Sequence, residues 1–228
     1  MPDNSCPSPM PDMLPAIRFA PVVHLQTGET VTLIAETEKR FEERAVFGRA
    51  AQAAERSGDA HPSPAVWLAA HIENVANDAH TSTTLRPVIV AAPLAALLHP
   101  DTPTACDAAI RRTRLCPQEI CIEISDAALA LPSGDSQSAI EALRRCGFRV
   151  SLNAARSWQT PLSASLRLLL DSIRIDAQHL ETEPELEKRV ETAVACGMSV
   201  IAENVRWRDG AYLASIGIDH GLRPRADA

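Results

Sequence analysis

Residues 140–153 read IEALRRCGFRVSLN, and this stretch decides the fold class. Its first half carries apolar residues at helical spacing, Gly147 ends the helix, and an apolar strand follows at once. Glycine adopts at low cost the left-handed conformation that closes a helix end. The same exit recurs at residues 195–198 (ACGM) and 215–218 (SIGI). Short apolar strands that each follow a helix are typical of a parallel sheet covered by helices, so the sequence predicts an α/β protein.

The rest of the chain continues the alternation of strands and helices. An extended run over residues 19–25 passes through a turn at Thr27-Gly28-Glu29 into a second run over 30–35. About seven strand–helix units favour an α/β barrel over a doubly wound open sheet, and no glycine-rich nucleotide fingerprint appears. Helices are predicted over residues 41–57, from Ser63-Pro64 onward, and over 184–196. Further strands are predicted over residues 88–90, 120–124, 148–152, 173–175 and 199–202, with a last one starting at Ile218.

Composition excludes several classes of function. Hydrophobic residues make up 46% and charged residues 22% of the 228, which is ordinary for a protein with a sizeable core. The net charge of −7 and a pI near 5.5 argue against nucleic-acid binding through bulk electrostatics. The six cysteines form no Cys-x-x-Cys pair and are expected to be reduced thiols, with no zinc site.

The chain is expected to hold one domain behind a short tail. Residues 1–15 are rich in proline and predict a disordered tail, and residues 16–228 predict a single barrel domain. No apolar run reaches the roughly 18 residues that a membrane span needs, and the N-terminus lacks the pattern of a secretory signal. We therefore expect a cytoplasmic protein that does not bind membranes.

Acidic and amide side chains stand where predicted strands end, which is where α/β barrels place their chemistry. These residues are Glu123, Asn153, Asp176 and Glu203. Carboxylates at successive strand ends can converge on one metal ion. The competing interpretation is that each acid caps the following helix or pairs with a base, and the pattern alone favours that interpretation.

Five segments together resemble EAL domains, the bacterial phosphodiesterases of cyclic di-GMP. They are the opening strand and turn from Phe19 to Glu29, Cys116–Asp126 (CPQEICIEISD), Leu143–Val150 (LRRCGFRV), Leu170–Asp176 (LDSIRID) and Val200–Val205 (VIAENV). Their order and spacing cover nearly the whole chain after the tail. The resemblance implies a modified TIM-type (β/α)8 barrel. Because nothing after Gly221 matches the family's closing Gln-Gly-Tyr segment, it also implies a truncated C-terminal end.

Members of this family hold divalent metals with carboxylates and an asparagine, and the metals activate the attacking water. The resemblance assigns the signature glutamate to Ile34, or to Glu36 in a register two residues later. The metal-binding asparagine corresponds to Ala91, and the bridging aspartate pair to Asn153 and Ala154. The family's catalytic lysine corresponds to Arg174, and the second glutamate of its Ala-Glu-Gly-Val-Glu segment to Arg206. Only Glu123, Asp176 and Glu203 survive, so we expect no catalytic residue, no metal and salt bridges from the two arginines to the remaining acids.

The sequence thus favours a degenerate EAL domain that is not an enzyme and that regulates a process by binding an unidentified protein. One alternative is a sensor that binds cyclic di-GMP without cutting it. A second alternative is an active phosphodiesterase with atypical ligands, which alone would require magnesium or manganese. Partner contacts are expected at Arg156, Trp158 and Trp207, with core packing as the equal alternative for both tryptophans. The resemblance also implies a homodimer through the later helices of the barrel.

Overall fold

The computed structural model describes residues 17–37, 63–130, 134–158 and 160–222. Its strands close into one barrel in the order of the sequence. They are β1 (Ile17–His24), β2 (Thr30–Thr37), β3 (Val88–Ala91), β4 (Ile120–Ser125), β5 (Arg149–Asn153), β6 (Ser172–Asp176), β7 (Ser199–Glu203) and β8 (His220–Leu222). Strands β2 to β8 run parallel, whereas β1 is antiparallel to both of its neighbours, β2 and β8. The predicted modified (β/α)8 barrel is confirmed.

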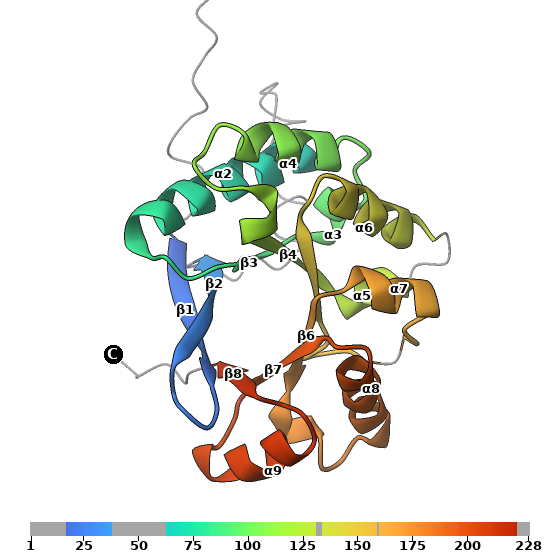
Figure 1. The fold of residues 1–228 in the computed structure, drawn as a ribbon. Coiled ribbons are helices and arrows are strands. Elements are labelled where there is room, and N and C mark those ends of the chain that lie inside the picture. The colour runs from blue at the N-terminus through green and yellow to red at the C-terminus, as the bar shows by residue number, and fades with distance from the viewer. Residues whose placement is uncertain (1–16, 38–62, 131–133, 159, 223–228) are drawn as a thin grey trace, which may run out of the picture.

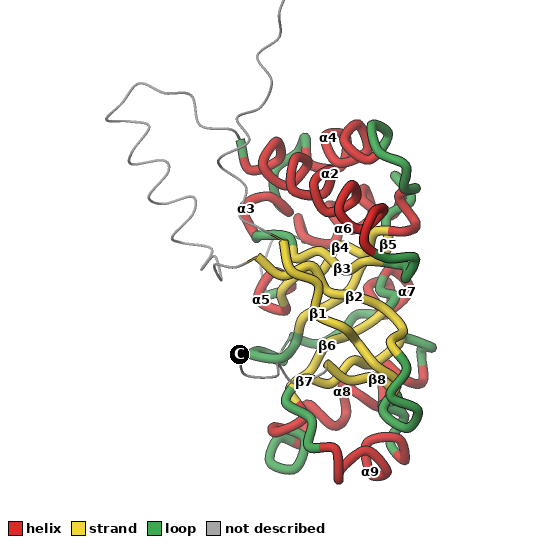
Figure 2. The backbone as a smooth tube through the Cα atoms, turned by 90° about the vertical axis from the view of Figure 1, so that its left-hand side faces the viewer, coloured by secondary structure: helices red, strands yellow, loops and turns green. Residues whose placement is uncertain are grey.

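Helices surround the barrel on its outside (Figure 1). The α-helices are α2 (Pro64–Ser82), α3 (Leu94–Leu97), α4 (Thr102–Ile110), α5 (Asp126–Leu129), α6 (Asp135–Arg145), α7 (Ala164–Leu169), α8 (Pro184–Ala195) and α9 (Gly210–Ser215). Short 3-10 turns add η2 (Pro117–Glu119), η3 (Ala177–His179) and η4 (Trp207–Asp209). Figure 2 shows the barrel from the side, with α3 and α5, which follow β3 and β4, toward its left edge.

Local signals in the sequence place the ends of these helices. Ser63 caps α2, because its hydroxyl accepts a hydrogen bond from the Val66 backbone N–H, and Pro64 opens the first turn. The glycines that end α6, α8 and α9 all have positive φ: Gly147 has 92°, Gly197 has 76° and Gly217 has 85°. The predicted helix exits are therefore confirmed.

Side chains of each strand alternate between the barrel interior and the helices. On the inside, Val22, Ile34, Ile89, Cys121 and Ile201 pack into one apolar layer across the middle of the barrel. The opposite faces of the same strands pack against the helices in a larger aliphatic core. The apolar layer divides the interior into two mouths, one at the C-terminal ends of the parallel strands and one at their N-terminal ends.

Several predictions differ from the structure or fall outside it. The last strand begins at His220 rather than at Ile218, which is fully buried just before it. The predicted helix over 41–57, the tail over 1–15 and the truncation after Gly221 concern residues that lie outside the described ranges, apart from Gly221 and Leu222. Within those ranges, no helix combines the length and apolarity that crossing a membrane would require.

Candidate functional site at the C-terminal mouth of the barrel

The C-terminal mouth brings together the polar residues that the sequence places at strand ends. Alternation along the strands turns Glu123 of β4, Asn153 of β5, Arg174 of β6 and Glu203 of β7 toward the interior. The parallel register sets Asn153 beside Arg174 and Asp176 beside Glu203. The predicted cluster therefore forms, and Arg174 stands within it.

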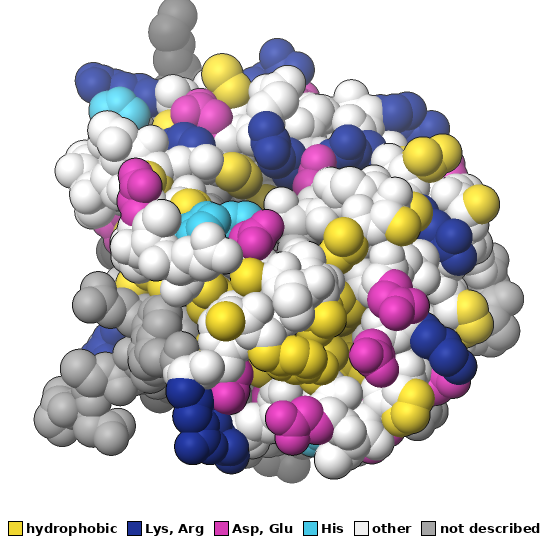
Figure 3. All heavy atoms as spheres, turned by 60° about the horizontal axis from the view of Figure 1, so that its bottom comes forward, with side chains coloured by type: hydrophobic (Ala, Val, Ile, Leu, Met, Phe, Trp, Pro, Cys, Tyr) yellow, Lys and Arg dark blue, Asp and Glu magenta, His cyan; other side chains and the backbone are white. Residues whose placement is uncertain are grey.

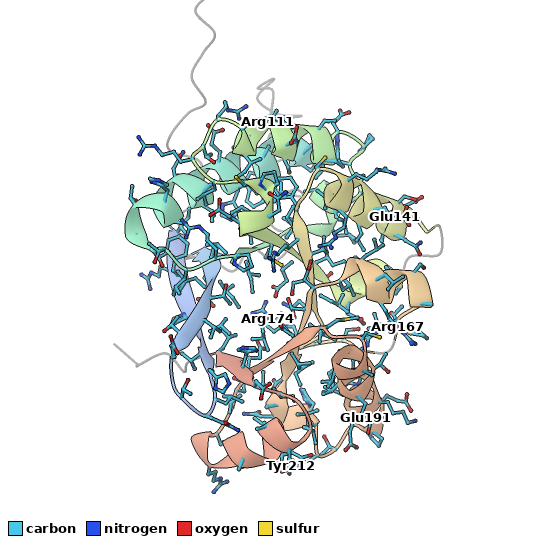
Figure 4. The ribbon with its side chains drawn as sticks, in the orientation of Figure 1. Arg111, Glu141, Arg167, Arg174, Glu191 and Tyr212 are labelled. Carbon is cyan, nitrogen blue, oxygen red and sulfur yellow. The ribbon has the colours of Figure 1, made fainter. Side chains whose placement is uncertain are left out.

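Arg174 bridges two of the surviving acids. Its Nη2 atom donates to Glu123 Oε2, and its Nη1 atom lies 3.5 Å from Glu203 Oε2. The Glu123 side chain is 2% exposed and that of Arg174 is 13% exposed, so this contact is largely shielded from solvent. Figure 4 shows the Arg174 side chain inside the ring of strands. Arg174 therefore forms the salt bridges to Glu123 and Glu203 that the sequence predicts.

Asn153 completes the surroundings of Glu123. Its Nδ2 atom donates to Glu123 Oε2 over 3.2 Å, while its Oδ1 atom accepts from the Ala155 backbone N–H at 3.1 Å. Glu123 Oε1 is buried without a hydrogen-bond partner among the described residues. Burial raises the pKa of the Glu123 carboxyl above its ordinary value, and Arg174 and Asn153 offset that rise only in part. One carboxylate oxygen is therefore committed to two donors, and the other lies in a poorly solvated space.

The remaining positions that the resemblance assigns to the site supply few side-chain oxygen atoms that could bind a metal. Ala91 pairs with Glu123 in register but carries no donor atom. Ala154 is fully buried, and its backbone N–H donates to the Arg174 carbonyl oxygen over 2.7 Å. Ile34 is 3% exposed within the apolar layer. Glu36 lies two residues nearer the C-terminal end of β2, on the same face of the strand, and is the only acid of that strand.

Asp176 acts as a cap, as the competing interpretation of the strand-end acids proposed. Its Oδ1 atom accepts from the Gln178 backbone N–H at 2.9 Å and so begins η3. Its Oδ2 atom accepts from the Asn204 side chain at 2.8 Å and lies 3.9 Å from His179 Nε2. Asp176 is therefore already satisfied by local donors.

The expectation for Arg206 is wrong. This residue follows β7 and is exposed, and its guanidinium forms no ion pair with any residue in the described ranges, so the expected salt bridge to the family's acids is not formed there. Arg156 is likewise exposed after β5. The Trp158 ring is half-buried against the core and lies 5.0 Å from the His179 ring, centroid to centroid. Trp207 begins η4, and its side chain lies outside the described part of the chain.

Beside this mouth lies a buried ion pair that the sequence analysis did not identify. Arg189 of α8 pairs with Asp126, the first residue of α5, and both side chains are almost inaccessible. Ser157 Oγ donates to Asp126 Oδ2 at 3.1 Å, and Arg189 also donates to the Thr160 carbonyl oxygen. A groove of about 450 Å³ opens here, and Trp158, Thr160 and Arg189 line part of it. An acid directly after a strand was the available signal, but its partner is remote in sequence.

The fold and this mouth define a (β/α)8 barrel of the EAL type. The sequence model of the EAL domain family matches residues 16–221, and the chain belongs to that family. No protein of curated function matches the sequence.

Solved structures with the same fold share little sequence identity with this chain. BlrP1 of Klebsiella pneumoniae, in its pH 9.0 manganese and cyclic di-GMP complex, is 17% identical with a TM-score of 0.69, over 95% of this chain and 56% of that one. The EAL domain of Mycobacterium smegmatis DcpA is 16% identical with a TM-score of 0.61, over 90% and 88%. The PaMucR phosphodiesterase in complex with c-di-GMP is 16% identical with a TM-score of 0.67, over 91% and 88%. This chain also spans 60% of the EAL enzyme Bd1971.

The donor set at this mouth does not fit the divalent metals that the family resemblance implies. A hard cation needs several oxygen ligands, preferably charged ones. Here the Arg174 guanidinium already lies between Glu123 and Glu203, and Ala91 and Ala154 provide no side-chain oxygen. Within the described ranges, no three His, Cys, Asp or Glu residues are grouped to hold a metal. The site is a salt-bridged polar cluster in which the Arg174 guanidinium is shared between two carboxylates.

Proposed function

We propose that this chain is an EAL domain that does not hydrolyse cyclic di-GMP and that regulates a process by binding a protein partner. The structural neighbours BlrP1 and PaMucR were solved in complex with cyclic di-GMP, which links the fold to that nucleotide. The side chains at the C-terminal mouth of this chain differ from those that a metal-dependent phosphodiesterase needs.

One observation carries the proposal: Arg174 holds a fixed positive charge against Glu123 and Glu203. A guanidinium stays charged at every pH that proteins tolerate, so Arg174 cannot become neutral by losing a proton, as a lysine can. A divalent cation placed between the same carboxylates would meet this charge at close range in a poorly solvated space. Metal-activated attack of water on a phosphodiester therefore lacks its first requirement here.

Surface features beside the mouth support a protein partner. The groove with Trp158 combines an aromatic ring with Arg167 and Arg189, and aromatic residues and arginine are enriched at protein interfaces. On the face where α8 and α9 lie, Figure 3 shows hydrophobic side chains gathered among acidic ones. Val194 of α8 and Tyr212 of α9 are among the large hydrophobic residues that remain exposed.

A second candidate is a sensor that binds cyclic di-GMP without cutting it. Arg156 and Arg206 favour it, because both are exposed after strands that end at this mouth, and neither guanidinium forms an ion pair with a described residue. Such arginines can bind phosphate groups in a bidentate manner. The acidic net charge of −7 opposes this candidate at long range.

Calorimetric titration with cyclic di-GMP, with and without magnesium, separates the candidates. The protein-binding regulator predicts no heat of binding in either condition. Binding that is independent of magnesium and lost in Arg156→Gln/Arg206→Gln would establish the sensor instead. Binding that requires magnesium would contradict the account of the mouth, because it would mean that metal and Arg174 coexist.

A further inference from the structure

A second cavity opens at the opposite end of the barrel, where the parallel strands begin. It encloses about 180 Å³. Its floor is the apolar layer that closes the barrel, represented by Ile89, Cys121 and Ile201. Figure 1 looks into this end of the barrel, with the turn between α6 and β5 toward the viewer. The EAL-type mouth lies on the far side of the apolar layer, so the two spaces are separate.

The rim of this cavity carries one basic group without an ionic partner. Arg149, the first residue of β5, lines the cavity, is exposed, and forms no ion pair with any residue that the structure describes. Asp171 is the only acid among the described residues of the lining, and it is engaged elsewhere: it pairs with Arg144 and accepts from the Val150 backbone N–H at 2.9 Å. Among the side chains that line the cavity, the one charge without an ionic partner is therefore that of Arg149.

Neutral polar groups stand near Arg149. Ser199 and Ser172, the first residues of β7 and β6, line the cavity, and Ser172 Oγ donates to Ser151 Oγ at 2.9 Å. His220 of β8 also lines it, and burial lowers the pKa of this imidazole below its ordinary value, so it is neutral near pH 7. Hydroxyl and imidazole groups offer hydrogen bonds to an anion without repelling it.

We propose that the cavity at the N-terminal mouth binds a small organic carboxylate with a short apolar body, held at its charged end by Arg149. The fork of a guanidinium matches the two oxygens of a carboxylate. The apolar floor and walls, which include Val22 and Val31, suit a hydrocarbon body. A cavity of this volume is below the range that holds drug-sized molecules, so the ligand has only a few non-hydrogen atoms.

Butyrate is the probe, with butyramide as its uncharged counterpart of nearly the same shape. Titration of ¹⁵N-labelled protein, followed by amide chemical shifts, is expected to show butyrate binding with a dissociation constant of about a millimolar. The shifts should gather at the first residues of β5, β6, β7 and β8. Butyramide should cause no comparable change, because it carries no charge for Arg149 to bind.

Arg149→Gln should weaken butyrate binding about tenfold or more, as expected for loss of a charge-assisted hydrogen bond. Arg114→Gln is the matched control, since Arg114 is exposed, lies outside the cavity lining and should leave the affinity unchanged. Ser199→Phe, at an exposed strand start, should fill the cavity and abolish binding in a folded protein. The proposal is overturned by equal affinities for butyrate and butyramide, by unchanged affinity in Arg149→Gln, or by absence of any binding.

Discussion

Replacing Arg174 by methionine tests the internal ion pair of the C-terminal mouth. Methionine keeps most of the length of the side chain but removes the charge and every donor. Glu123, which is 2% exposed, then loses the ionic partner of its Oε2 atom and keeps only the Asn153 amide at 3.2 Å. Removing one member of a buried ion pair typically costs about 3–5 kcal/mol, because the other charge stays buried without compensation. For a chain of 228 residues this corresponds to a fall in Tm of about 10 °C.

The destabilisation of Arg174→Met should grow with pH. The folded-state pKa of Glu123 is already raised by burial, so its contribution to stability is full below the ordinary carboxyl pKa and is lost as pH rises through the raised value. Without Arg174 that pKa rises further, since the guanidinium is the main group that opposes the effect of burial. The variant should therefore lie close to the wild type at about pH 5 and far below it at about pH 8.

Urea unfolding of wild type, Arg174→Met, Glu123→Gln and the double variant at both pH values gives the coupling free energy of the pair. Arg112→Gln provides the control: the Arg112 side chain is 56% exposed and that of its partner Glu73 is 30% exposed, and solvent-exposed pairs contribute only about 0–1 kcal/mol. If Arg174→Met lowers the free energy of unfolding no more than Arg112→Gln does, and shows no dependence on pH, the ion pair is not the organising contact of this mouth.

Two further predictions concern the rest of the barrel. Gly217→Ala should destabilise the fold by about 2–3 kcal/mol, because its φ of 85° is unfavourable for alanine and the new Cβ would lie 2.8 Å from Val194 side-chain carbons. Gly197→Ala is the control: its φ is 76°, but no atom lies near the new Cβ, so it should cost only about 1 kcal/mol. Equal losses of unfolding free energy in urea would refute the steric argument. Burial lowers the pKa of His71 to about 4 in the folded protein. As pH falls, His71 is therefore protonated in the unfolded chain before it is protonated in the folded protein, and about 3 kcal/mol of stability should be lost between pH 6.5 and pH 4. His71→Leu should remove that part of the pH dependence, and an unchanged pH profile in the variant would contradict the assignment.

The order and type of the elements could be predicted because local signals agree with the global fold. The glycine exits at 147, 197 and 217 mark the start of three barrel strands, and the structure gives each a positive φ. The last strand was misplaced because Ile218 is apolar and follows the glycine, whereas the pairing that defines β8 starts only at His220. Pairing between strands is a tertiary property that an apolar run alone does not fix.

The sequence predicted which strand-end residues lie together at the C-terminal mouth, but it predicted only some of their contacts. Arg174 pairs with Glu123 and Glu203, since alternation on β6 turns it inward. Arg206 lies beyond the end of β7, where the chain leaves the barrel, and its direction depends on a loop that periodicity does not describe. The cavity around Arg149 could not be predicted, because an empty space arises from the shapes of residues on many strands at once.

Hydrolysis of cyclic di-GMP in manganese tests the central claim most directly. The assay compares the unmodified chain, Asn153→Asp/Ala154→Asp and a buffer blank, with the PaMucR phosphodiesterase as the active control. We expect no turnover above the blank from either form, because Arg174 remains between the carboxylates and Ala91 still lacks a ligand atom, and groups that act as a unit recover little when repaired in part. Steady turnover by the unmodified chain would contradict the account, and turnover by the double variant alone would show that Glu36 and the remaining acids suffice to bind the metal.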